Sequence, residues 1–136
     1  MTTLKGKIDF ALLVSATNAN PNGDPLNGNR PRENYEGYGE ISDVCIKRKI
    51  RNRFQDMGQK IFVQSDDRSD DGYTSLKERA EGCEELNNEI KKKKKADRER
   101  FAQIACQEWL DVRTFGQVFA FKGEEVSVGI RGPVSI

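Results

Sequence analysis

A loop rich in asparagine, glycine and proline constrains this 136-residue chain more than any other feature does. It runs from Ser15 to Arg32 and contains two Asn-Gly pairs and three prolines: Asn22-Gly23, Asn27-Gly28, Pro21, Pro25 and Pro31. Asparagine and glycine tolerate the backbone angles of tight turns, and proline fixes φ. The segment is therefore expected to fold as successive turns that expose backbone N–H groups and asparagine amides. A solvated surface turn is the simplest interpretation, but the length of the loop and the arginines at its end favour a binding function.

An alternating apolar pattern precedes the loop. Apolar residues occupy every second position of this stretch, at Ile8, Phe10, Leu12 and Val14. A period of two predicts a β-strand over Ile8 to Ser15, in a sheet that helices cover on one side.

A basic amphipathic helix is predicted after the loop, over Ser42 to Met57, with Ser42 or Asp43 as its cap. At 100° per residue, four apolar side chains share one stripe: Ile46, Ile50, Phe54 and Met57. Cations lie beside the stripe, one flank carrying Lys47, Arg48 and Arg51 and the other Lys49 and Arg53. Gly58 is expected to end the helix.

The middle of the chain is less regular. Lys60 to Gln64 is short, β-branched and aromatic, which predicts a second strand. An exposed loop is expected over residues 65–72, and a largely solvated helix over residues 75–95. A well-packed helix is predicted over residues 97–115 and ended by Gly116, because five side chains share a helical stripe: Phe101, Ile104, Ala105, Trp109 and Val112.

The last segment predicts a strand that pairs with Ile8 to Ser15. Alternate positions place five apolar side chains on one face: Val126, Val128, Ile130, Val134 and Ile136. The opposite face carries Gly129 and Arg131, where a ligand could approach the backbone beside a cation. The sheet would be incomplete at Ile136, so a portion of a longer protein is expected.

Charge is segregated along the chain although the formal net charge is only +1. Residues 65–90 hold nine acidic and three basic residues, and residues 41–60 hold two acidic and six basic residues. Five consecutive lysines, Lys91 to Lys95, could bind nucleic acid, but a solvated helix face paired with the upstream acids explains them more simply.

Several chemistries are disfavoured. The chain has no histidine, and its three cysteines have no metal-ligand spacing, so neither a zinc site nor a disulfide framework is expected. Asp24 and Asp43 could hold a magnesium ion, but turn formation and helix capping explain both. No apolar run has membrane-spanning length, so a soluble, reduced, cytoplasmic protein with no membrane partner and no cofactor is expected. RNA or single-stranded DNA binding and a protein-interaction module remain.

Three segments resemble the Cascade backbone subunit of type I-C CRISPR systems, the Cas-seven family of the RAMP superfamily. They are Ile8-Asp9-Phe10 through Asn18-Ala-Asn20-Pro-Asn22-Gly23-Asp24-Pro25 with Asn29-Arg30-Pro31-Arg32; Asp111-Val-Arg113-Thr-Phe115-Gly116; and Val128-Gly129-Ile130-Arg131-Gly132-Pro133-Val134. The resemblance implies an α+β fold, a ferredoxin-like (RRM-like) palm, truncated, with an inserted helical subdomain. Residues 1–64 would form the first part of the palm, residues 65–116 the helical insertion, and residues 117–136 a further palm strand.

The resemblance also implies a non-catalytic subunit for antiviral defence. Its partners would be CRISPR RNA, target DNA reached through the guide, other copies of itself in an oligomeric filament, and other Cascade subunits. The alternatives are a metal-dependent ribonuclease of the same superfamily, using Asp24 or Asp43, and an interaction module without RNA. The expected RNA-binding residues come from the loop, the basic helix and the last strand: Asn18, Asn20, Asn22, Gly23, Arg30, Arg32, Lys47, Arg48, Arg51, Gly129 and Arg131.

Overall fold

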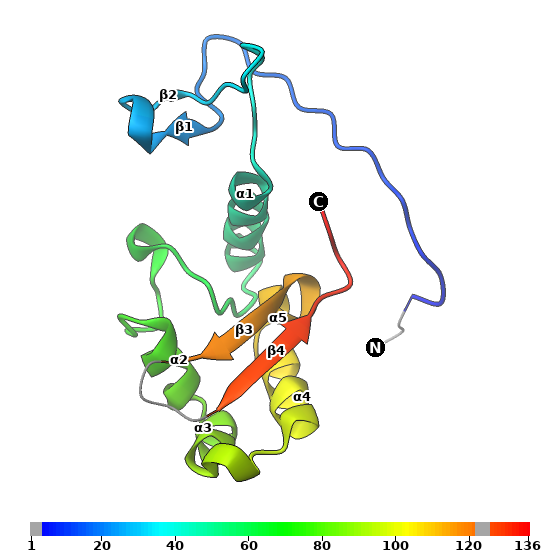
Figure 1. Ribbon diagram of the computed structural model, residues 1–136, viewed down its shortest axis with the longest axis vertical. Coiled ribbons are helices and arrows are strands. Elements are labelled where there is room, and N and C mark those ends of the chain that lie inside the picture. The colour runs from blue at the N-terminus through cyan, green and yellow to red at the C-terminus, as the bar shows by residue number, and fades with distance from the viewer. Residues whose placement is uncertain (1–3, 122–125) are drawn as a thin grey trace. The chain divides into compact units, whose positions relative to one another are not determined.

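The structure is a computed structural model that describes residues 4–121 and 126–136 (Figure 1). The chain divides into two compact units, Met1–Ser42 and Asp43–Ile136. Helices and strands are mixed, as expected for an α+β protein. Among the described residues, no helix combines the length and the apolar character that crossing a membrane requires.

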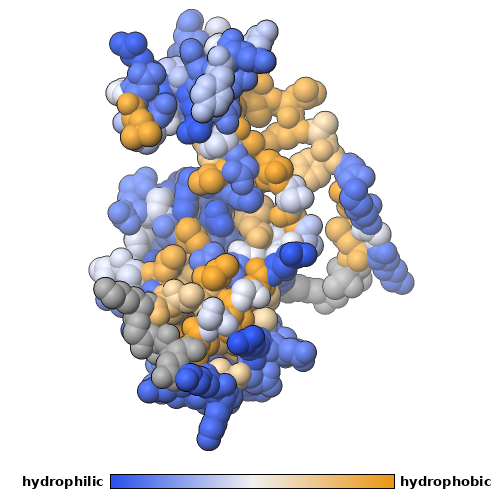
Figure 2. All heavy atoms as spheres, viewed as in Figure 1, coloured by the Kyte–Doolittle hydropathy of each residue, from blue (hydrophilic) through white to orange (hydrophobic). Residues whose placement is uncertain are grey.

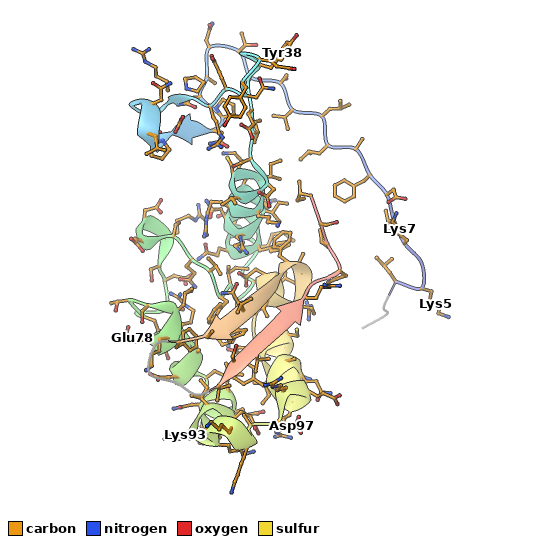
Figure 3. All side chains as sticks on the ribbon, in the orientation of Figure 1. Lys5, Lys7, Tyr38, Glu78, Lys93 and Asp97 are labelled. Carbon is orange, nitrogen blue, oxygen red and sulfur yellow. The ribbon has the colours of Figure 1, made fainter. Side chains whose placement is uncertain are left out.

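Consecutive turns organise the first unit. Strand β1 (Gly23–Asp24) pairs antiparallel with β2 (Arg30–Pro31), and the 3-10 turn η1 (Pro25–Asn27) joins them. Gly28 ends that turn with a left-handed φ of 59°. A second turn follows, closed by a bridge between Glu33 and Gly39, and it presents Tyr38 to solvent (Figure 3). The prediction of successive turns is therefore confirmed.

The strand predicted over Ile8 to Ser15 is not present. The segment belongs to no strand and its side chains are exposed, from 56% for Val14 to 95% for Leu13. The alternation of apolar residues indicates which side chains could face a core. A strand also needs a neighbouring strand that accepts and donates its backbone hydrogen bonds. That partner is a non-local feature which the pattern does not supply.

Helix α1 (Asp43–Asp56) opens the second unit and confirms the predicted basic helix. Gly58, at a φ of 72°, follows its end as expected. The apolar stripe is only partly buried: Ile46, Ile50 and Phe54 are intermediate, and Met57 is 59% exposed.

The region after α1 departs from the predictions. Residues 60–64 form no strand, although Ile61 and Phe62 are 1% and 0% exposed. The 3-10 turn η2 (Asp66–Arg68) follows them. The helix expected to be largely solvated is two helices, α2 (Leu76–Gly82) and α3 (Glu84–Lys91), which contribute to the core three buried side chains: Ala80, Leu86 and Ile90.

Buried charges explain why α2 and α3 look solvated in sequence. Arg79 on α2 donates to both carboxylate oxygens of Asp71, at 2.5 and 3.0 Å, and to the carbonyl oxygen of Phe62 at 3.0 Å. Glu89 on α3 is 2% exposed and accepts from Lys92 at 2.6 Å. Charged residues can be buried when they are paired in this way, so hydropathy alone underestimates the core.

The helix predicted over residues 97–115 is divided into α4 (Arg98–Glu108) and α5 (Leu110–Phe115). Trp109 separates them with an extended backbone, φ −120° and ψ 123°. Gly116 ends α5 as expected, at a φ of 79°.

A hairpin of β3 (Gly116–Ala120) and β4 (Ser127–Arg131) follows α5, with α4 and α5 behind it in Figure 1. The sequence predicted the strand that contains β4 but not β3. Val126 and Val128 face the core as expected, being 7% and 4% exposed. The core is built around the Phe119 ring, which contacts the rings of three other residues: Phe62, Phe101 and Trp109.

Candidate nucleic-acid interface

Cations and an aromatic ring gather where α5 ends and β3 begins. The ammonium of Lys47 lies 5.9 Å from the centre of the Phe115 ring, and the guanidinium carbon of Arg51 lies 5.2 Å from it. Cations at such distances are attracted by the ring quadrupole. Arg131 belongs to the same end of the hairpin, because its register partner is Gly116, the residue after Phe115. Of the predicted site residues, Lys47 and Arg51 thus lie over the Phe115 ring, and Arg131 is paired in register with the residue that follows Phe115.

The three cations predicted on one flank of α1 differ in their partners. Lys47 forms an ion pair of 3.0 Å with Asp43 one turn earlier, and the Asp43 side chain is 51% exposed. Lys47 lowers the pKa of Asp43 by donating a hydrogen bond to it. The Lys47 side chain itself is 26% exposed. Because a partly exposed pair of this kind contributes little to stability, Lys47 can exchange Asp43 for another anion.

Arg48 and Arg51 point into the unit instead. Arg48 donates to the carbonyl oxygen of Val63 at 2.8 Å. Burial, together with the neighbouring Arg51, lowers the pKa of Arg48, but a guanidinium still stays charged at neutral pH. The side chain of Arg51 is 12% exposed and pairs with Asp111 at 3.0 Å.

Asp111 is the centre of this arrangement. Its carboxylate is 1% exposed and accepts from the Phe62 N–H at 2.7 Å, the Val63 N–H at 3.1 Å and Arg51 Nε at 3.0 Å. One side chain of α5 thereby binds α1 and the segment that was predicted to be a strand. The backbone groups that a neighbouring strand would satisfy are satisfied here by a carboxylate.

The outer face of the hairpin, on the side away from α4 and α5, is turned toward the viewer in Figures 1 and 2 and is exposed. Alternate positions put Val118 opposite Gly129 and Ala120 opposite Ser127, and all four residues are exposed. A side chain built at Gly129 would meet nothing within 4 Å. Gly129 and Arg131 are both exposed, and ligand binding at these two residues stays a prediction.

The other predicted site residues belong to the first unit and shape its turns. The Asn20 amide donates to the Asn29 carbonyl at 2.7 Å, and Asn22 Oδ1 accepts from the Ser42 N–H at 2.9 Å. A Cβ on Gly23 would lie 1.9 Å from Oδ1 of the exposed Asn29 side chain, so a larger residue there would displace that amide.

Exposed polar groups of the same unit remain accessible to a ligand. Asn18 has a left-handed φ of 51° and is exposed, as is Arg30. Arg32 pairs with Glu40 at 3.1 Å while keeping 43% of its side chain exposed. The loop is thus a self-supporting set of turns with polar groups on its surface.

Comparison with known proteins adds what geometry alone does not. The family model described as CRISPR-associated protein Cas7 matches residues 6–136. The chain belongs to the Cas7 family. It is also 31% identical over 127 residues to a protein of Haloferax volcanii named CRISPR-associated protein Cas7, covering 92% of this chain and 35% of that protein. The chain therefore spans about a third of the length of the relative that it matches.

Two residues of the cluster, Asp111 and Phe115, were not among the predicted site residues. Both lie in one of the segments that carry the resemblance to the Cas7 family, and they are four positions apart on one helical face. That four-residue spacing was the feature of the sequence that could have indicated that Asp111 and Phe115 act together. The acids considered for metal binding have structural partners: Asp24 accepts from the Leu26 N–H at 3.0 Å, and Asp43 pairs with Lys47.

Proposed function

We propose that the chain is the N-terminal part of a non-catalytic backbone subunit of a type I-C Cascade complex, which binds CRISPR RNA along its spacer. The palm would be ferredoxin-like, and other copies of the subunit, other Cascade subunits and target DNA reached through the guide would be its partners in the cytoplasm. The observation that carries the proposal is the position of Lys47 over Phe115, next to an exposed two-stranded face that carries Arg131, in a chain of the Cas7 family.

The geometry suits an RNA backbone better than a base-specific contact. Exposed cations bind phosphates without reading sequence, and a subunit that accepts any spacer needs that property. An accessible backbone at Gly129 allows a sugar–phosphate chain to approach the strand closely. The asparagine loop supplies amides and backbone N–H groups, which also suit phosphate and sugar oxygens.

A binding titration with two unrelated single-stranded RNA sequences tests this function. The proposal expects similar affinities for both sequences and steep weakening with salt. Strong preference for one sequence, or no measurable binding, would overturn it. Magnesium-dependent cleavage of either RNA would instead support the ribonuclease alternative. For the complex purified from cells, absorbance at 260 nm relative to 280 nm separates an RNA-bound subunit from an interaction module that carries none.

A further inference from the structure

Lys47 and Arg51 both lie over the Phe115 ring, but they pair with carboxylates of very different exposure. Arg51 reaches the 1% exposed carboxylate of Asp111, whereas Lys47 reaches the 51% exposed carboxylate of Asp43. A cation that leaves a buried carboxylate leaves behind a charge that is neither paired nor exposed to solvent, which is strongly unfavourable. A cation that leaves an exposed carboxylate strands nothing. Lys47 is therefore free to turn to a phosphate, and Arg51 is not.

Asp111 also fixes the surroundings of Lys47. It joins α1, through Arg51, to Phe62 and Val63, and Arg48 reinforces the same junction by donating to the Val63 carbonyl at 2.8 Å. Phe115, four residues after Asp111 on α5, lies beneath both cations. The position of Lys47 over that ring therefore depends on the rotation and the distance of α1 relative to α5, which the Arg51–Asp111 pair sets.

We propose that Arg51 and Asp111 are positioning residues of the RNA interface, which hold α1 against α5 so that Lys47 presents its charge to a phosphate over Phe115. This inference rests on the proposed RNA-binding function. It assigns Arg51, whose side chain is less exposed than that of Lys47, to a role that does not include touching RNA. It also means that tight RNA binding requires Asp111, a buried acid whose negative charge would by itself repel RNA.

The sign of the effect at Asp111 distinguishes the two roles of Arg51. Asp111→Asn removes a negative charge and keeps an oxygen acceptor for the Phe62 N–H. If Arg51 were a phosphate contact restrained by Asp111, this change would release it, tighten RNA binding and steepen the salt dependence. If Arg51 is a positioning residue, the same change weakens binding by about tenfold, comparable to the loss of one charged contact. It then also flattens the slope of log K against log salt by about 0.7, the value of one phosphate.

A double-mutant cycle separates positioning from a general loss of folded protein. Lys47→Met is measured in the wild-type chain and in the Asp111→Asn background, with the folded fraction of each variant taken from its thermal melt. We expect Lys47→Met to weaken binding about tenfold in the first and less than about twofold in the second, because Lys47 no longer reaches the phosphate there. Equal effects in the two backgrounds would overturn the inference, since Lys47 and Asp111 would then act independently.

Arg51→Met provides the second variant if Asp111→Asn does not fold. It keeps an apolar side chain over Phe115. If Arg51 is a positioning residue, Arg51→Met weakens RNA binding and flattens the slope of log K against log salt only by the contribution of Lys47. Adding Lys47→Met to this variant should then change neither the affinity nor the slope. If Arg51→Met and Lys47→Met each flatten the slope of log K against log salt and their effects add in the double variant, Arg51 is itself a phosphate contact. A wild-type chain that binds no RNA would remove the proposed function itself. A wild-type chain that binds RNA and a Lys47→Met variant that binds equally well would remove only the positioning inference.

Discussion

Gly116 and Gly132 approach each other so closely that neither position has room for a side chain. A Cβ on Gly132 would lie 2.4 Å from the Gly116 nitrogen, and a Cβ on Gly116 would lie 2.6 Å from the Gly132 nitrogen. The end of α5 is thereby held against the chain that leaves β4. Phe115 and Arg131, which we place at the RNA interface, are the neighbours of these two glycines in sequence.

Gly132→Ala should destabilise the second unit, because the added methyl group must displace backbone atoms of residues 114–116. We expect a loss of about 1–3 kcal/mol in the free energy of unfolding, the usual effect of overpacking. Gly129→Ala is the matched control, since it adds the same group on the same segment where nothing lies within 4 Å. Equal denaturation midpoints for the two variants would contradict the close approach.

Gly129→Ala makes a further prediction for binding. Its stability should stay near that of the wild-type chain, but its affinity for RNA should fall, because the methyl group stands between the exposed strand and an approaching sugar–phosphate backbone. Fluorescence titration with single-stranded RNA measures the effect. Unchanged affinity would show that RNA does not approach β4 closely at this position.

Local patterns predicted the local elements of this fold. Helix α1 follows from the spacing of Ile46, Ile50 and Phe54, and the turns of the first unit follow from Asn-Gly pairs, because both depend on neighbours within a few residues. The role of Asp111 could not be read in this way. Its partners Arg51 and Phe62 lie about 60 and 49 residues away in sequence, and a carboxylate in an apolar helix face gives no sign of which donors it meets.

The same limit explains the misplaced strands. Ile61 and Phe62 have the composition and the burial of a strand, but the N–H groups of Phe62 and Val63 donate to the Asp111 carboxylate and not to a neighbouring strand. Among the site residues, helix geometry predicted that Lys47, Arg48 and Arg51 share one flank of the basic helix, and the last strand supplied Arg131; their binding of RNA stays a prediction. The sequence could not show that Lys47 can exchange its partner and that Arg51 cannot. This difference depends on the exposure of Asp43 and Asp111, which is set by tertiary structure.

Acid should weaken the second unit through Asp71 and Glu89. The hydrogen bond from Arg79 lowers the pKa of Asp71, and that from Lys92 lowers the pKa of Glu89. A lowered folded-state pKa means that the stabilisation is complete above the unfolded value of about 4 and is lost as pH falls through the folded value. Urea unfolding followed from pH 7 to pH 2 should therefore show decreasing stability below about pH 5.

Asp71→Asn identifies one source of this dependence. The variant should be less stable than the wild type at pH 7, because Arg79 loses a charged partner in a site where its side chain is 6% exposed. Its stability should also fall less steeply with acid, since one of the two carboxylates no longer takes up a proton. Parallel pH profiles for variant and wild type would refute this assignment.

Asp24 should be a structural residue and not a catalytic one. Its side chain caps the 3-10 turn by accepting from the Leu26 N–H at 3.0 Å. We expect single-stranded RNA incubated with the chain and magnesium to stay intact on a denaturing gel. Cleavage that Asp24→Ala abolishes would establish a ribonuclease and contradict the non-catalytic proposal.

The salt dependence of RNA affinity tests the central proposal most directly. The Lys47→Met, Arg131→Met double variant should bind every RNA sequence more weakly than the wild-type chain. The slope of log K against log salt should also be shallower by about 1.4, corresponding to two lost phosphate contacts. Lys60→Met is the control, because it removes one charge from a side chain that is 70% exposed and pairs with Glu108 at 2.7 Å; it should leave the slope unchanged. A double variant that keeps the affinity and the slope of the wild type would show that RNA is not held over Phe115.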